Sequence, residues 1–160
     1  MKKKLILSLF VLSMLVCLVG CGKAKFKDDV SLETLEEIFD RKLGSADMAA
    51  MNSGYLSGAM HLDPSQFGLY VVKLNSRGVN IDEYGIFKAR NMDEVDDVKD
   101  AVEGYLKLRR DTWMEEYMPK EKPKLEKAVV TVCGRYVMYL IASDELRTTL
   151  TDSFVSALKA

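Results

Sequence analysis

The sequence predicts an α+β fold in which a four-stranded antiparallel sheet, made of two hairpins, packs against about three helices. Apolar residues recur at helical spacing in three segments, and β-branched and aromatic residues concentrate in two paired stretches between them. The predicted order is helix, hairpin, helix, hairpin, helix. We expect one sheet with the helices on one face, and two smaller sheets are the alternative.

The first predicted helix covers residues 31–43, where five apolar residues share one face: Leu32, Leu35, Ile38, Phe39 and Leu43. Asp29 and Ser31 are candidate N-caps, and Gly44 follows as a stop signal. Residues 45–66 mix Ala and Met with Ser, Gly and Asn, so only short helical turns are predicted there.

Two hairpins are predicted from strand-forming composition. Residues 67–74 and 82–89 form the first, joined by turn-forming residues that include Gly78. The second is "AVVTVCGRYVMYLIAS", residues 128–143, with Gly134 in its turn. Both of its strands are continuously apolar, which predicts that both faces are covered or that the strands lie centrally.

The longest predicted helix begins near Asn91, which forms a capping pair with Glu94, and extends until Pro119. Its apolar stripe consists of Val95, Val98, Val102, Leu106, Trp113 and Tyr117. The last helix begins near Ser143 or Asp144. Its apolar face consists of Leu146, Leu150, Phe154 and Leu158.

The N-terminal segment differs in composition from the rest of the chain. Lys2, Lys3 and Lys4 precede fifteen uncharged residues from Leu5 to Val19, an arrangement typical of a secretory signal peptide. A membrane-spanning helix usually needs about 20 apolar residues, so this run is short for one. A signal peptide is therefore predicted to precede the α+β domain.

The next residues indicate where this segment is removed. Leu18, Val19, Gly20 and Cys21 resemble the lipobox of bacterial lipoproteins, in which cleavage makes a cysteine the new N-terminus. The predicted cleavage site is the bond between Gly20 and Cys21, and the predicted lipid attachment site is the Cys21 thiol. A diacylglyceryl group with palmitate-like chains would anchor the protein to the extracytoplasmic face of the cell membrane. The alternatives are an uncleaved anchor or a signal peptide with a chance cysteine.

Cleavage divides the chain into a signal peptide (1–20), a lipidated tether (21–29) and a single α+β domain (30–160). Loss of three lysines leaves 20 basic and 24 acidic residues, so the mature net charge is −4. This balance does not favour nucleic-acid binding. With Cys17 removed and Cys21 lipidated, Cys133 has no intramolecular disulfide partner. We expect it to be a buried apolar residue, and a reactive or intermolecular thiol is the alternative.

Three segments resemble a known family: "DEYGIFKA" (82–89), the helix "MDEVDDVKDAVEGYLKLR" (92–109), and the block from "YMP" to "LEKAVVTVCGRYVMYLIASD" (117–144). Together with the lipobox, they resemble the clostridial-type bacterial lipoproteins grouped as domain of unknown function 4358. The resemblance covers residues 82–144 well and the earlier part loosely. It implies a membrane-anchored, extracytoplasmic α+β domain and assigns no activity, cofactor or catalytic residue.

The sequence shows no pattern typical of a catalytic, cofactor or metal site. His61 is the only histidine, so no two imidazoles can bind zinc, and a loop hydrogen bond with Asp63 is the preferred interpretation. The carboxylates of residues 93–100 lie off the apolar stripe and are expected on a solvated helix face. No catalytic residues, cofactor or metal are therefore predicted.

The leading hypothesis is a non-enzymatic lipoprotein that recognises another component of the cell envelope or assists its assembly. The alternative is a lipoprotein that binds a small molecule or peptide through the methionine-rich stretch Met48–Met60 with Tyr55 and Tyr70, although core filling is the preferred role of these methionines. A third hypothesis is an envelope hydrolase whose carboxylates come from different elements.

Overall fold

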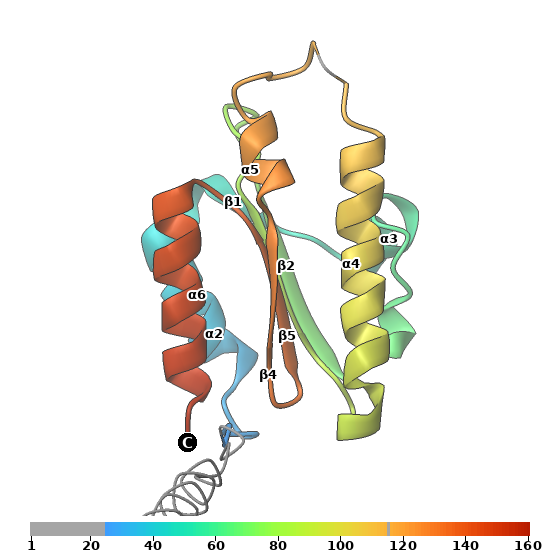
Figure 1. Ribbon diagram of the computed structural model, residues 1–160, viewed down its shortest axis with the longest axis vertical. Helices are drawn as coiled ribbons and strands as arrows, with labels where there is room; N and C mark the ends of the chain where they lie inside the picture. Colours follow the sequence, from blue (N-terminus) through green and yellow to red (C-terminus); the bar gives the residue numbers. More distant parts are fainter. Residues whose placement is uncertain (1–24, 115) are drawn as a thin grey trace, which may run out of the picture.

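The computed structural model describes residues 25–114 and 116–160, whose strands form one antiparallel sheet (Figure 1). The order of its five strands is β1, β2, β3, β5, β4. Their bounds are β1 Met48–Ala50, β2 Leu69–Asn75, β3 Glu83–Lys88, β4 Val129–Cys133 and β5 Tyr136–Ile141. Both predicted hairpins are confirmed, as β2–β3 and β4–β5, and the pairing of β3 with β5 joins them.

The sheet has one more strand than the four predicted. β1 lies in residues 45–66, where the sequence predicts only short helical turns. The strand was not predicted because Met-Ala-Ala is too short to show the alternation of apolar and polar residues. Its pairing with β2, from Met48 with Asn75 to Ala50 with Lys73, makes it a strand. The rest of the stretch does form short turns: η2 Ser45–Asp47, α3 Ser53–Gly58 and η3 Pro64–Gln66.

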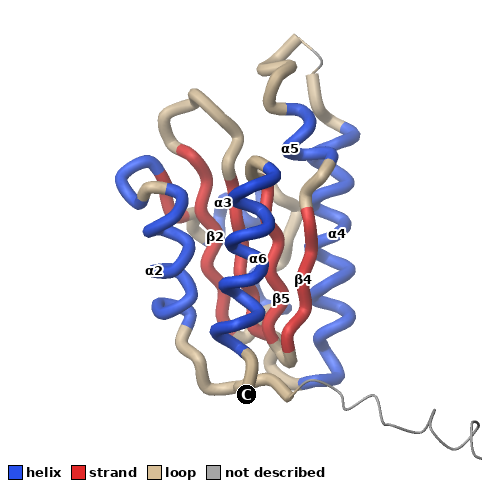
Figure 2. The backbone as a smooth tube through the Cα atoms, turned by 60° about the vertical axis from the view of Figure 1, so that its left-hand side comes forward, coloured by secondary structure: helices blue, strands red, loops and turns tan. Residues whose placement is uncertain are grey.

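Helices cover both faces of the sheet, which corrects the prediction of one covered face. α2 Leu32–Leu43 and α6 Asp144–Leu158 lie on one side, and α3 and α4 Val95–Asp111 lie on the other (Figure 1 and Figure 2). The reason is the composition of the central strands, because all six residues of β5 are buried. Successive side chains of a strand point to opposite faces, so both faces need a cover.

Two hydrophobic clusters fill the spaces on either side of the sheet. Tyr84 and Ile86 of β3 belong to the cluster under α2 and α6, whereas Phe87 belongs to the cluster under α4. Cys133 is buried in the first cluster, as predicted, and burial raises the pKa of its thiol. α5 Lys122–Glu126 is a short helix whose Leu125 is buried in the cluster under α4.

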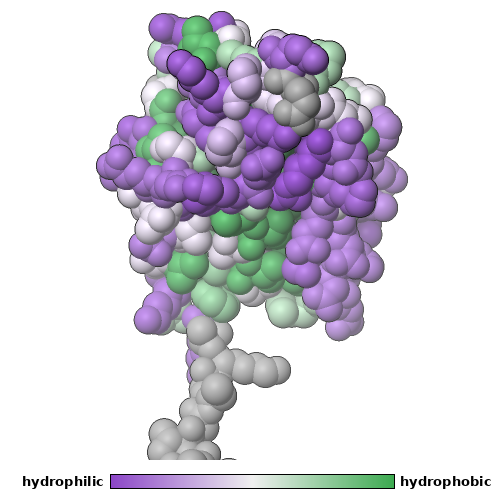
Figure 3. Space-filling model, turned by 45° about the horizontal axis from the view of Figure 1, so that its top comes forward, coloured by the Kyte–Doolittle hydropathy of each residue, from purple (hydrophilic) through white to green (hydrophobic). Residues whose placement is uncertain are grey.

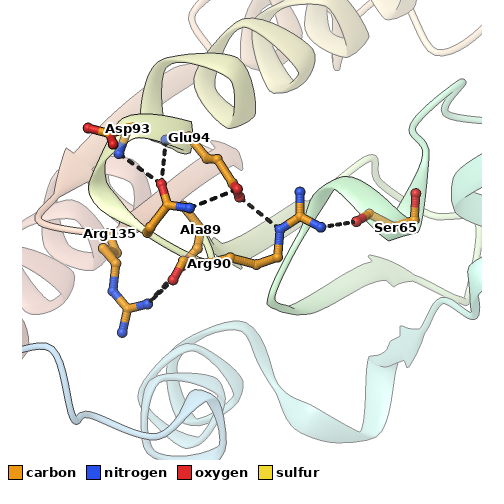
Figure 4. Close-up of polar contacts among 7 residues, drawn as sticks. Ser65, Ala89, Arg90, Asp93, Glu94 and Arg135 are labelled. Atoms are coloured by element: carbon orange, nitrogen blue, oxygen red, sulfur yellow. Dashed lines mark hydrogen bonds and ion pairs between the residues drawn. The ribbon is translucent and has the colours of Figure 1, made fainter.

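The starts of the long helices follow the predicted caps. Ser31 and Ser143 each accept a hydrogen bond from a backbone N–H three residues further on. Before α4, the 3-10 helix η4 Met92–Glu94 is capped by Asn91, whose amide donates to Glu94 Oε1 at 2.8 Å and accepts from the backbone N–H of Glu94 (Figure 4). The predicted capping pair is confirmed.

α4 ends at Asp111, earlier than predicted, and Trp113 and Tyr117 lie beyond it. The Thr112 hydroxyl donates to the Leu108 carbonyl at 2.8 Å and so completes the last turn. Beyond it, Trp113 is partly buried against the cluster under α4, whereas Tyr117 is half exposed. The apolar stripe read from the sequence therefore joins residues of a helix to residues of the loop that follows it.

The segment of residues 25–29 packs against the end of the sheet where β3 ends and β5 begins, which we call the base. Phe26 forms a β-bridge with Lys159. Arg135, in the β4–β5 turn, donates two hydrogen bonds to the Asp28 carboxylate, at 2.7 and 2.5 Å. The opposite end, where β2 ends and β3 begins, is called the distal end. In residues 25–114 and 116–160, no helix is both long and apolar enough to cross a membrane.

Candidate functional site

A pocket of about 290 Å³ opens at the distal end, between the β2–β3 connection and the C-terminal end of α4. This volume is close to the lower limit for ligand pockets, roughly 300 Å³. The sheet and its connection contribute Leu74, Asn75, Gly78, Asn80, Ile81, Asp82 and Glu83. α4 and the following loop contribute Arg109, Thr112, Trp113, Met114 and Tyr117.

One wall of this distal pocket contains a buried carboxylate. Glu83, the first residue of β3, is 1 % exposed. Its Oε1 accepts hydrogen bonds from the hydroxyls of Tyr139, at 2.7 Å, and Tyr105, and its Oε2 accepts from Arg109 Nη2 at 3.2 Å. These four residues are called the Glu83 centre. A carboxylate can be buried here because each oxygen has donors that replace water.

The positions of these four residues follow from strand and helix geometry. Tyr105 and Arg109 are four residues apart on α4, so they lie on the same face of the helix. Tyr139 lies directly opposite Gly85 in the pairing of β5 with β3. A Cβ atom at Gly85 would be 2.3 Å from the Tyr139 ring. The absence of a side chain at Gly85 therefore leaves room for this ring, whose hydroxyl reaches Glu83.

Burial perturbs the protonation of the Glu83 centre. It raises the pKa of Glu83, and the Arg109 charge and the two phenol hydroxyls oppose this rise by stabilising the carboxylate. Burial and the nearby carboxylate also raise the pKa values of Tyr105 and Tyr139, so both phenols remain protonated donors. A perturbed carboxyl group in a pocket is a common feature of functional sites.

The pocket offers hydrogen-bond donors more than acceptors. Within the described residues, Arg109 Nε and Trp113 Nε1 are buried without a partner. The side-chain oxygens of Asn75 and Asn80, by contrast, already accept backbone N–H groups at 3.1 and 2.9 Å. The ring of Trp113 lies 6.0 Å from that of Tyr117 and adds an aromatic surface. A ligand with a carbonyl or carboxylate oxygen beside an apolar group fits these properties.

A second carboxylate of the pocket, Asp82, is held by an ion pair. Its Oδ1 accepts from Lys124 Nζ at 2.8 Å, and Lys124 also lies 2.7 Å from Glu121 Oε2. The same Glu121 oxygen accepts the backbone N–H of Ile81 at 3.2 Å. Asp82 and Glu83 are thus each paired with a cation, and these pairs fix the β2–β3 connection against α4 and α5.

The predicted site residues fall in two groups. Gly20 and Cys21, the predicted cleavage and lipid attachment residues, lie outside the described residues. His61 is exposed, and Asp63 accepts hydrogen bonds from the N–H and hydroxyl of Ser65, at 2.9 and 2.8 Å, where the sequence predicted one with His61. No group of His, Cys, Asp and Glu that could hold a metal occurs within the part of the chain that the structure describes.

The methionine-rich stretch contributes to the core, as preferred from the sequence. Met48 and Met60 are buried on opposite sides of the sheet. Tyr55 and Tyr70 are half-buried against the cluster under α4, and none of these four residues lines the distal pocket. Four acidic residues around the start of α4 are exposed, as predicted: Asp93, Asp96, Asp97 and Asp100. Glu94 is half-buried.

The residues of the Glu83 centre were not singled out from the sequence, although one signal was present. Glu83 lies two and four residues before Gly85 and Phe87, so a strand places all three side chains on one face. Phe87 is strongly apolar, so this face is expected to be buried, and a carboxylate on the same face then needs a buried partner. The identity of that partner depends on how α4 crosses the sheet, which local periodicity does not specify.

Comparison with known proteins gives one match. The model of a family described as "Domain of unknown function (DUF4358)" matches residues 41–142, which include β1 to β5 and the whole Glu83 centre. None of the curated proteins and none of the solved structures matches the chain.

Proposed function

Because the chain belongs to the DUF4358 family, a domain of unknown function, we propose a role from its own geometry: a membrane-anchored, extracytoplasmic binding protein whose distal pocket holds a small ligand. The observation that carries this proposal is the arrangement of the molecule, with residues 25–29 at the base and the pocket at the distal end. The anchor would thus leave the pocket facing away from the bilayer.

The anchor part of the proposal rests on the Gly20–Cys21 lipobox and on the docking of residues 25–29. Four chain steps separate Cys21 from Lys25, and at up to about 3.6 Å each they span at most about 14 Å. Acyl chains on Cys21 would therefore hold the base close to the lipid headgroups. Two chains are needed for stable anchoring, because burial contributes about 0.8 kcal/mol per CH₂ group.

The ligand part of the proposal rests on the exposed part of Arg109 and on the apolar side chains beside it. Arg109 is 32 % exposed, so part of its guanidinium group can meet a ligand while Nη2 stays on Glu83. Trp113, Met114 and Tyr117 supply apolar contacts beside it. A short peptide or a small organic acid with an apolar group has the matching chemistry. Catalysis is not part of this proposal, because Asp82 and Glu83 are both paired with cations.

Trp113 is the only tryptophan of the chain, so its fluorescence reports on the pocket directly. The full chain, purified in detergent, should be titrated with N-acetylated Leu and Phe and with the corresponding amines, which have the same apolar group and no oxygen acceptor. The acids should change the emission and the amines should not. At 100 times its Kd, a bound acid should stabilise the protein by about 2.7 kcal/mol. Equal responses to acid and amine would contradict the assigned chemistry.

The anchor is tested separately by mass spectrometry of the protein isolated from membranes. The expected N-terminal peptide begins at Cys21 and has the mass of a diacylglyceryl group. The variant Cys21→Ala should lack the diacylglyceryl mass and retain the first twenty residues. An intact N-terminus with an unmodified Cys21 would contradict the anchor and leave the ligand result standing.

A further inference from the structure

β4 forms one edge of the sheet and lacks the features that usually protect an edge strand. Natural sheets block exposed edges with charged residues, proline, bulges or very short strands. β4 has the sequence Val-Val-Thr-Val-Cys, without charge or proline, and pairs with β5 without interruption from Val129 to Cys133. The opposite edge, β1, has only three residues. β4 is therefore the edge that can accept another strand.

The register shows which backbone groups are free. Cys133 pairs with Tyr136 across the two-residue turn, so their backbone groups bond to each other, and bonding alternates along the ladder. Thr131 then bonds to β5, whereas the N–H and C=O groups of Val130 and Val132 point away from the sheet. The structure gives these groups no partner within its described residues. They form a row of two donors and two acceptors at the spacing of a strand.

A groove of about 320 Å³ runs beside this row, between β4 and α4. It is lined by Glu103, Leu106, Arg110, Ala128 and Val130. Val132 is 37 % exposed on the same edge. Figure 1 shows β4 at the front of the molecule between α6 and α4, and Figure 3, with the top turned forward, shows hydrophobic surface in the middle of the view with hydrophilic residues above it and to its right.

We propose that β4 is the docking edge for an extended segment of a partner protein, which adds to the sheet as a sixth strand. The free groups of Val130 and Val132 bind its backbone, and an apolar side chain of the segment enters the groove beside Leu106. Glu103 and Arg110 are seven residues apart on α4, about 10 Å along the helix axis. Glu103 also lies 3.2 Å from Lys99 Nζ, and Arg110 Nε donates to the Leu125 carbonyl at 3.3 Å. The remaining atoms of these two side chains match a basic and an acidic side chain that flank the apolar one on the same face of the segment.

A second copy of the chain fits this edge less well, given the proposed membrane anchor. Two β4 strands that paired symmetrically would run antiparallel, so the base of one copy would lie at the distal end of the other. When the strands stand upright on the bilayer, as in the proposed arrangement, an anchor that reaches at most about 14 Å cannot hold both bases on it. This step rests on the proposed function, whereas the free edge and the groove do not.

The test uses the full chain in detergent and a fluorescein-labelled peptide, Thr-Lys-Thr-Val-Thr-Glu-Thr, read by fluorescence anisotropy. When it runs antiparallel to β4, its Lys lies near Glu103, its Val in the groove and its Glu near Arg110. The control peptide exchanges Lys and Glu. Val130→Pro removes an outward N–H without breaking a bond to β5, and Ala50→Pro is the matched change at the β1 edge, where Met51 rather than Ala50 bonds to β2.

We expect Val130→Pro to weaken the Kd of the first peptide about tenfold, because an edge hydrogen bond is lost. Ala50→Pro should bind as the parent does, and the exchanged peptide should bind more weakly to all three proteins. Equal binding by the Val130→Pro variant, or no binding to the parent, would overturn the proposal. A disulfide between two Val132→Cys copies in one nanodisc would also overturn it, in favour of a second copy. The peptide result holds whether or not Cys21 is lipidated, so its failure and a failure of the anchor are distinguishable.

Discussion

Consecutive residues of β3 build two polar centres on opposite faces of the sheet. Glu83 faces α4, where the carboxylate belongs to the strand and the cation, Arg109, to the helix. Tyr84 faces α2 and donates to Asp40 Oδ1 at 2.9 Å. Lys73 of β2 binds the same Asp40 at 2.6 Å and Glu36 at 2.5 Å. In this second group, called the Asp40 centre, the carboxylates belong to the helix and the cation to the strand.

The two centres differ in their access to water. The Glu83 carboxylate is sealed between the sheet and α4, although its partner Arg109 is 32 % exposed. The carboxylates of the second centre, Asp40 and Glu36, are 16 % and 31 % exposed. The Asp40 centre also has two carboxylates for one lysine, so either can replace the other. The Glu83 carboxylate on the strand is thus buried, and no second carboxylate can replace it. The carboxylates on α2 keep contact with solvent. The sealed centre is the one beside the distal pocket.

Glu83→Ala should reduce the free energy of unfolding more than any other change proposed here, because it removes the buried carboxylate of the Glu83 centre. The substitution leaves the hydroxyls of Tyr105 and Tyr139 without an acceptor and Arg109 without its ion pair. Loss of one partner of a buried pair destabilises by about 3–5 kcal/mol. Urea unfolding followed by circular dichroism measures the change. A loss below about 1 kcal/mol, the size of an exposed pair, would show that the centre is not sealed.

Asp40→Ala should have a smaller effect, about 1–2 kcal/mol. The Tyr84 hydroxyl loses its acceptor, but Lys73 retains Glu36 at 2.5 Å. The double variant with Glu36→Ala should lose more than the sum of the two single changes, because Lys73 is then buried without a partner. Strict additivity in the same urea experiment would contradict the idea that the two carboxylates replace each other.

The pH dependence sharpens the comparison further. The pKa of Glu83 in the folded protein lies above its unfolded value, near 4.3, so protonation of this group favours the fold. Its contribution is complete below the unfolded pKa and is lost as the pH rises through the folded pKa. The unfolding free energy of the parent minus that of Glu83→Gln, measured from pH 4 to 8, should therefore fall with pH. A rise would mean that Arg109 outweighs burial.

Trp113→Phe should have the smallest effect on stability, within about 0.5 kcal/mol. The substitution keeps an aromatic ring in the pocket and removes an indole N–H that has no partner among the described residues. The affinity for an N-acetylated Leu, followed by calorimetry, should nevertheless fall. Unchanged affinity would remove Trp113 from the proposed binding role.

Much of the fold was predictable because its signals are local. The caps at Ser31, Ser143 and Asn91, together with the two hairpins, follow from spacing and turn residues alone. β1 and the covering of both faces were not predicted, because they depend on pairing with β2 and on how the hairpins join through β3 and β5. The pocket depends on the same long-range arrangement, since Glu83 and Arg109 meet only when α4 crosses the sheet.

The empty position at Gly85 has a consequence for the tolerance of the chain to substitution. Any residue with a Cβ there would displace the Tyr139 ring, and with it a donor to Glu83. A deep mutational scan that selects only for folded protein should therefore find position 85 intolerant even of alanine, although it neither lines the pocket nor carries a polar side chain. Intolerance at position 85 would show that the Tyr139 ring needs the space that a side chain there would occupy.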